Sequence, residues 1–160
     1  MSASTALLWL FVIFLGITFG AGIYEKRIVV PHWLSSSGAA GRHWNAEAAR
    51  QDDTGRRFWA FVTTIPLTLL AAANLIVAWR IAGAVRASWL AASILTIGDR
   101  VFTFSYFIPT MIRLMRAPDS TESVMKAVRW ANLAYVRLAI VLAAWLTALN
   151  AFSLLRQSQL

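Results

Sequence analysis

The stretch TIGDRVFTFSYFIPTMIRL, residues 96–114, is apolar enough for a membrane helix but carries Asp99 and Arg100 near its middle. An ionised side chain at the centre of a membrane helix costs about 2.5–3.5 kcal/mol even on the mildest scale. Such charges must face other helices and find partners there. This stretch therefore predicts a helical bundle with charges in its interior.

The whole composition is that of a membrane protein. Of 160 residues, 59% are apolar and only 14% are charged, which is typical of an integral membrane chain. Cysteine is absent, so disulfides, thiolate metal sites and cysteine nucleophiles are excluded. The net charge of +8 comes mostly from residues that flank apolar runs, as membrane topology requires. We expect the lipid bilayer as a partner and no nucleic acid.

Four apolar runs are long enough to span a bilayer, namely residues 6–23, 58–79, 87–114 and 128–155. They predict one all-α domain over residues 1–160, an integral membrane up-down four-helix bundle with a long loop at 24–57. Gly16 and Gly20 have the small-xxx-small spacing that allows close helix approach. Pro66 predicts a kink in the second run. Ser120 and Thr121 are candidate N-caps of the last helix.

The basic residues predict the orientation. Ten lie in the two long loops, and three lie on the opposite side: Arg80, Arg86 and Arg156. The positive-inside rule places both long loops in the cytoplasm and both termini outside. We expect insertion in a bacterial inner membrane.

Asp99 and Arg100 are expected about 16–18 Å from the cytoplasmic end of their helix, at about 1.5 Å rise per residue. Arg137, in the last helix, is expected about 10 Å deep, and its long side chain can cover much of the difference. We therefore predict an Asp99–Arg137 contact. Two interpretations remain open, a buried ion pair that fixes helix register and a functional site.

A polar and aromatic stripe follows Asp99 on the same helix face: Phe102, Thr103, Tyr106 and Thr110. Their spacing of i+3, i+4, i+7 and i+11 predicts one wall of a cavity. Tyr24 and Glu25 are expected at its mouth, with Trp130 and Tyr135 at its rim. The alternative is an interfacial aromatic belt, for which the candidates are Trp33, Trp44, Trp59 and Trp130.

The candidate metal ligands are His32 and His43. Their separation of eleven residues matches no compact metal-ligand spacing, and a third ligand would have to come from a nearby carboxylate. We predict no organic cofactor and leave metal and haem open. The chain has no glycine-rich phosphate loop, nucleophile elbow or zinc-binding HExxH motif.

Three segments carry a family resemblance: GAGIYEKRIVVPHW (20–33), FSYFIPTMIRLMR (104–116) and RWANLAYVRLAIVLAAWLTALNAFSLL (129–155). Together they resemble the small four-helix membrane family, largely of unknown function, that includes the anthrone oxygenases. The matching positions are Glu25, Pro31, Trp33, Tyr106, Pro109, Thr110, Trp130 and Arg137. Family members often have an asparagine where this chain has Ala134, with Asn132 close by.

The resemblance implies an oxidoreductase that oxygenates a small hydrophobic aromatic or phenolic substrate inside the bundle. Such chemistry needs a base and a positive charge that holds the resulting anion. We favour Glu25 as the base and Asp99 as a counter-ion, with Arg100 or Arg137 stabilising the anion and Tyr106 donating a hydrogen bond. The expected substrate contacts are Tyr24, Trp33, Phe102, Thr103, Thr110 and Trp130.

Two other functions remain open from the sequence. One is a non-catalytic membrane protein that binds a lipid, a quinone or a partner helix. The other is proton-coupled transport through Asp99, which would require a homo-oligomer because four helices are few for a transporter.

Overall fold

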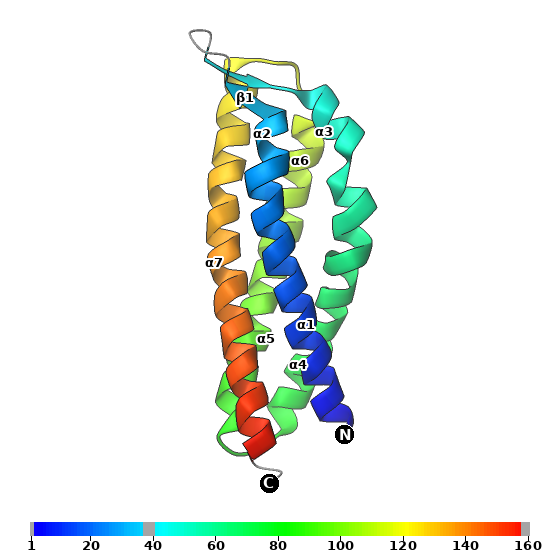
Figure 1. Ribbon diagram of the computed structural model, residues 1–160, viewed down its shortest axis with the longest axis vertical. Helices are drawn as coiled ribbons and strands as arrows, with labels where there is room; N and C mark the ends of the chain where they lie inside the picture. Colours follow the sequence, from blue (N-terminus) through cyan, green and yellow to red (C-terminus); the bar gives the residue numbers. More distant parts are fainter. Residues whose placement is uncertain (1, 37–40, 158–160) are drawn as a thin grey trace.

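The computed structural model describes residues 2–36 and 41–157, which form an elongated all-α bundle (Figure 1). In chain order the elements are α1 (Ala3–Tyr24), η1 (Glu25–Val29), α2 (Val30–Trp33), β1 (Leu34–Ser36), β2 (Arg42–Trp44), α3 (Ala46–Asp52), η3 (Gly55–Thr64), α4 (Ile65–Arg80), α5 (Val85–Phe102), η4 (Thr103–Phe107), α6 (Ile108–Leu114) and α7 (Thr121–Gln157). The elements labelled η are π-helical. The all-α prediction is confirmed.

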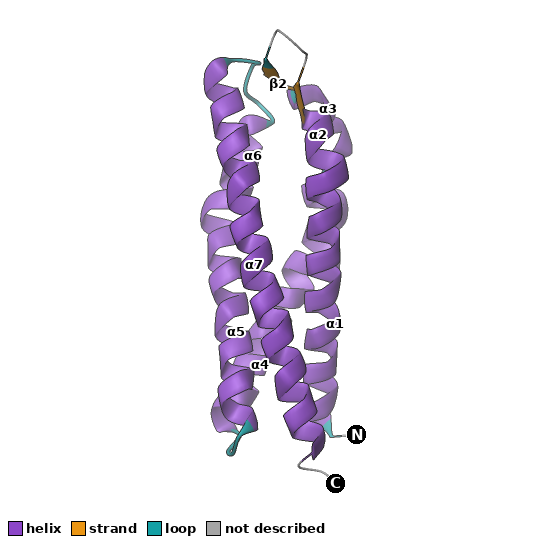
Figure 2. Ribbon diagram, turned by 60° about the vertical axis from the view of Figure 1, so that its left-hand side comes forward, coloured by secondary structure: helices purple, strands orange, loops and turns teal. Residues whose placement is uncertain are grey.

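The long helices run up and down. α1 packs against α4 and α7, and α5 packs against the same two helices, so the four close into a ring. Both termini lie at the end that holds the α4–α5 turn (Figures 1 and 2). The short antiparallel hairpin β1–β2, α3 and the α6–α7 connection lie together at the opposite end. We call this the hairpin end.

The structure changes several predicted boundaries. The first helix does not end near residue 23 but continues through η1 and α2 to Trp33. The predicted loop 24–57 therefore contains the end of the first helix, the hairpin and α3. The last helix begins at Thr121 instead of residue 128, and the Ser120 hydroxyl caps it by accepting from the Ser123 N–H at 3.2 Å.

Three π-helical segments of the described chain each end two residues before a proline: η1 before Pro31, η3 before Pro66 and η4 before Pro109. Proline lacks an N–H, and its ring clashes with the carbonyl four residues earlier. A wider π-helical turn moves that carbonyl away from the ring and lets the helix continue. At Pro66, where the sequence predicts a kink, the structure has a widened turn, and the same feature occurs in three of the long helices.

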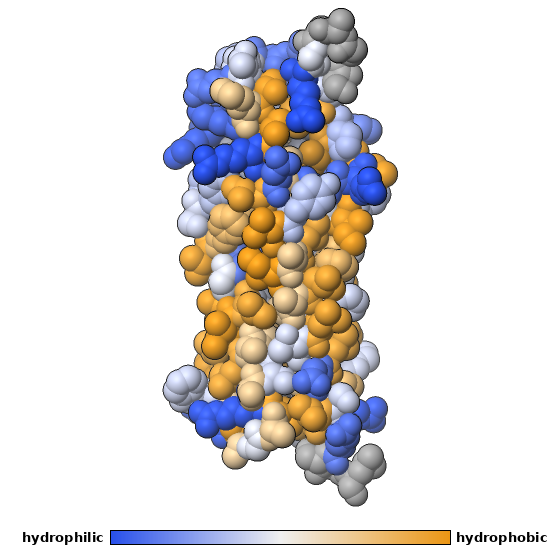
Figure 3. Space-filling view, turned by 90° about the vertical axis from the view of Figure 1, so that its left-hand side faces the viewer, coloured by the Kyte–Doolittle hydropathy of each residue, from blue (hydrophilic) through white to orange (hydrophobic). Residues whose placement is uncertain are grey.

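Three helices are long and apolar enough to cross a membrane: Ala3–Trp33, Gly55–Arg80 and Thr121–Gln157. They fit an integral membrane protein. Residues 85–114 form an equally continuous helix, but its charges, Asp99 and Arg100 among them, lower its hydropathy, and it is not among the three. On the face in view, Figure 3 shows a broad hydrophobic band across the middle of the molecule, with hydrophilic side chains gathered at both ends.

Glycines bring α1 close to α7. A Cβ atom on Gly16 would lie 3.1 Å from the Trp145 ring, and one on Gly22 would lie 2.7 Å from the Leu138 side chain. A Cβ on Gly20 would meet nothing within 4 Å. The predicted Gly16–Gly20 pair is therefore wrong in its second member, because Gly22 and not Gly20 faces α7.

Gly16→Val should lower the free energy of unfolding by about 1–3 kcal/mol, because the rigid Trp145 indole leaves no room for a larger side chain. Thermal unfolding of the detergent-purified protein measures the effect. Gly20→Val is the matched control, since it adds the same side chain to the same helix in open space. Equal losses in both variants would contradict the close approach at Gly16.

Candidate functional site

Four charged side chains form a layer between two apolar clusters: Glu25, Asp99, Arg100 and Arg137. We call them the charged layer. Toward the termini lies a core with Leu8, Phe11, Leu67, Trp89 and Ala144 among its members. Toward the hairpin end lies a second core that includes Trp33, Trp44, Phe107, Leu114 and Trp130. Two carboxylates and two guanidinium groups give the charged layer no formal net charge, which reduces the cost of burying it.

Asp99 is bonded to both arginines. Its side chain is completely buried, and that of Arg100 is almost so. Oδ2 accepts hydrogen bonds from Nε of Arg100 at 3.1 Å and also from its Nη2. Oδ1 accepts from Nε of Arg137 at 3.1 Å, which confirms the predicted contact between the third and fourth long helices. One carboxylate thus compensates two cations on adjacent helices.

Arg137 connects this pair to the other half of the bundle. Its guanidinium carbon lies 4.7 Å from the centroid of the Phe107 ring, within cation–π distance. The same guanidinium has an attractive charge interaction with Glu25 on the first long helix. Arg137 therefore contacts one carboxylate, that of Asp99, and the face of one aromatic ring.

Glu25 is partly buried and is held by donors from the second long helix. Its Oε1 accepts from the Trp59 indole N–H at 2.7 Å and from the Thr54 hydroxyl at 3.0 Å. The next residue, Lys26, turns toward α7, where it donates to the Ala131 carbonyl and lies 4.1 Å from the centroid of the Tyr135 ring. All four long helices therefore contribute to the charged layer and its hydrogen-bond partners.

The π-helical segment η4 alters the stripe predicted after Asp99. Thr103 and Phe107 are buried, whereas Tyr106 and Thr110 are only partly so. The Thr103 hydroxyl donates to the backbone carbonyl of Asp99 at 2.8 Å. The Tyr106 ring stacks on Phe102 with centroids 5.7 Å apart. Phe107, which sequence spacing did not select, is the aromatic residue that contacts Arg137.

Three tryptophans assigned to a possible interfacial belt are buried in the bundle instead: Trp33, Trp44 and Trp130. The Trp33 indole donates to Asp52 at 2.8 Å, and the Trp130 indole donates to the Phe107 carbonyl at 3.2 Å. The belt interpretation is therefore wrong for all three. Tyr24 is 61% exposed, so it faces away from the charged layer although Glu25 follows it.

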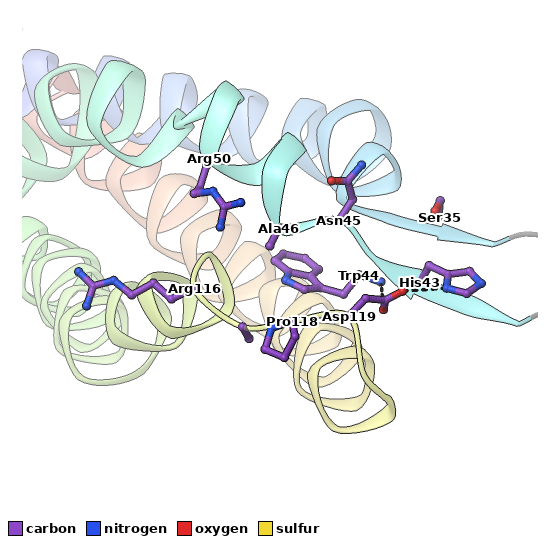
Figure 4. Close-up of a pocket in the computed structure, with 10 residues that line it drawn as sticks. Ser35, His43, Trp44, Asn45, Ala46, Arg50, Arg116, Pro118 and Asp119 are labelled. Atoms are coloured by element: carbon purple, nitrogen blue, oxygen red, sulfur yellow. Dashed lines mark hydrogen bonds and ion pairs between the residues drawn. The ribbon is translucent and has the colours of Figure 1, made fainter.

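The two histidines have different surroundings. His32 is exposed, and Nδ1 of His43 lies 2.9 Å from Oδ2 of Asp119 (Figure 4). Within residues 2–36 and 41–157, no three His, Asp or Glu side chains come close enough to hold one metal ion. The described side chains thus offer these histidines no shared ligand set.

Asp119 joins the hairpin to the α6–α7 connection. Figure 4 shows it beside β2, where Oδ1 accepts from the Trp44 backbone N–H at 2.9 Å. Nearby, Arg50 of α3 donates to the Met115 carbonyl at 2.6 Å. The Trp44 N–H, and then the His43 ring, hold the pKa of Asp119 below its ordinary value of 3.8. These contacts fix the hairpin over the second core.

Asp119→Asn should lower the melting temperature slightly at neutral pH, since exposed charge interactions contribute little. Because the folded-state pKa is depressed, the ionised carboxylate stabilises the fold fully above about pH 3.8 and loses this effect as the pH falls through the folded-state pKa. Thermal scans from neutral to acid pH should therefore show the difference between wild type and variant disappearing at low pH. A difference that stays constant into acid would contradict this role of Asp119.

Comparisons of the chain with protein-family models, curated proteins and solved structures found no match. Function is therefore inferred from the charged layer and its chemistry.

Proposed function

We propose that this chain is a four-span integral membrane oxidoreductase, similar to the anthrone oxygenases, that oxygenates a small hydrophobic phenolic or anthrone-like substrate without an organic cofactor. The observation that carries the proposal is the grouping of a carboxylate, a guanidinium and an aromatic ring between two apolar cores. The Arg137 guanidinium lies against the Phe107 ring, and Glu25 is held in the same layer by Trp59 and Thr54. Asp99 and Arg100 support this group from α5.

Each part has a task in the proposed reaction. Glu25 removes an acidic proton from the substrate C–H or O–H group. Arg137 holds the resulting oxyanion, and Phe107 provides an apolar surface for a flat ring. The electron-rich enolate then reacts directly with O2. For an anthrone, the methylene carbon becomes a carbonyl, one oxygen atom of O2 is retained there, and the other leaves as water with the two methylene hydrogens.

The bilayer is proposed to surround the hydrophobic band, with residues 85–114 as the fourth span. That helix packs between α4 and α7, and its two central charges are bonded inside the bundle instead of facing outward. Ten of the thirteen basic residues outside the charged layer belong to residues 26–57 and 113–129, the two parts of the chain that lead to and from the hairpin end. By the positive-inside rule this end is proposed to face the cytoplasm.

Oxygen uptake by the detergent-purified protein tests the enzymatic proposal, with an anthrone or a hydroquinone as substrate. We expect uptake that depends on both protein and substrate, together with a carbonyl product identified by mass spectrometry. An absorption spectrum and a metal analysis of the same sample test for flavin, haem, iron or copper. Absence of uptake with a tightly bound lipid in the sample would support the second candidate below.

The second candidate is a non-catalytic membrane protein that binds a lipid, a quinone or a partner helix. The contacts of Asp99 favour this candidate, because both carboxylate oxygens are already bonded to arginines. The Asp99–Arg137 ion pair can fix the register of the two helices without any catalytic role. On this proposal the charged layer is architectural.

A further inference from the structure

We infer that the outer face of α7 near the hairpin end holds the headgroup of an anionic phospholipid, with an acyl chain running along the helix. A shallow groove lies there, lined by Arg42 of β2 and by seven residues of α7 between Val124 and Val136. It is distinct from the charged layer, since it lies on the outside of the bundle and shares no residue with it. The inference depends on the proposed membrane insertion and not on the oxygenation chemistry.

Charge identifies the headgroup. Arg42 of β2 and Arg129 of α7 are both exposed at the groove. In the described part of the chain, neither guanidinium has an ion pair or a hydrogen bond to a carboxylate. The nearby acids are already engaged, Glu122 with Lys126 and Asp119 with His43. Two unpaired guanidinium groups from separate elements are suited to one phosphate.

The apolar lining of the groove identifies the source of the phosphate as a lipid. Along α7 most of the groove's lining is apolar: Val124, Met125 and Val128 precede Arg129, and Leu133 and Val136 follow it, Val136 about 10 Å further along at about 1.5 Å per residue. The residues after Arg129 lead toward the middle of α7, and Val136 is 50% exposed there. Basic residues at the cytoplasmic surface of a membrane protein attract anionic lipids. A free phosphate would use the arginines but not the apolar part.

Native mass spectrometry of the full chain, released from detergent micelles that contain equal phosphatidylglycerol and phosphatidylcholine, tests the site. We expect phosphatidylglycerol adducts to dominate in wild type. Each of Arg42→Ala and Arg129→Ala should weaken phosphatidylglycerol binding about fivefold, and the double variant about twentyfold. Arg57→Ala is the matched control, since Arg57 is exposed at the same end but outside the groove, and it should change binding less than twofold.

Two further measurements separate the lipid from other ligands. Leu133→Asn should reduce phosphatidylglycerol binding while both arginines remain, and inorganic phosphate should not displace the lipid. Equal adducts of the two lipids, an unaffected double variant or complete displacement by phosphate would each overturn the inference. Oxygen uptake should be unchanged in the Arg42 and Arg129 variants, so a failed lipid site and a failed enzymatic proposal give different results.

Discussion

Asp99→Asn is expected to lower the free energy of unfolding by about 3–5 kcal/mol, the largest stability effect that the structure indicates. The substitution keeps the shape of the side chain but removes the negative charge that is bonded to both Arg100 and Arg137. Arg100 is almost completely buried, so water cannot replace the lost carboxylate. Thermal or denaturant unfolding in detergent, followed by circular dichroism, measures the loss.

The variants of this layer should follow a definite order. Arg137→Gln should cost less than Asp99→Asn, because Arg100 still compensates Asp99 when Arg137 is neutral. The double variant should lose less than the sum of the two single losses, because it leaves one unpaired cation fewer than Asp99→Asn alone. Glu122→Gln is the control, since its pair with Lys126 is exposed and should contribute at most about 0.5 kcal/mol. Additive losses would contradict direct coupling of Asp99 and Arg137.

Spacing in the sequence was sufficient to predict contacts between residues on regular α-helices, where the position of a residue along the helix axis follows from its number. Asp99 and Arg137 lie on α-helical stretches of neighbouring helices, so a constant rise per residue was sufficient to bring them together. Thr103 is still buried on the Asp99 side of the helix, but the same approach failed beyond it. There η4 widens the helix and shifts its phase, so that Phe107 and not Tyr106 is buried beside Arg137. Pro109 was a signal for this shift, because all three described π-helical segments end two residues before a proline.

Contacts between segments far apart in the sequence could not be predicted from local sequence patterns. Trp59 looks like an interfacial tryptophan in sequence, and only the packing of η3 against the first helix brings its indole to Glu25. The hairpin also depends on a distant residue, because the Trp44 N–H donates to Asp119, which lies 75 residues later in the chain. Trp44 also donates to the Leu114 carbonyl, 70 residues away. Amphipathic spacing reports which face of a helix is buried but not which segment covers it.

Glu25→Gln should reduce oxygen uptake about 10²–10⁴-fold while the protein remains folded, if Glu25 is the base of the proposed reaction. The amide oxygen can still accept from Trp59 and Thr54, so the local hydrogen bonds persist. Arg137 keeps its bond to Asp99, so the neutral amide does not leave that guanidinium unpaired. The substitution therefore removes the capacity to take a proton and little else.

The measurement is the initial rate of oxygen uptake with an anthrone, at equal concentrations of folded protein judged by size-exclusion chromatography and circular dichroism. Glu47→Gln is the matched control, because Glu47 is an exposed carboxylate of α3 that is bonded to Arg50 and is not part of the charged layer. It should keep the wild-type rate. A Glu25→Gln protein with full activity would remove Glu25 from the mechanism, and the search for the base would then move to Asp99. A wild-type protein without activity in the same assay would instead favour the binding function, with the charged layer as architecture.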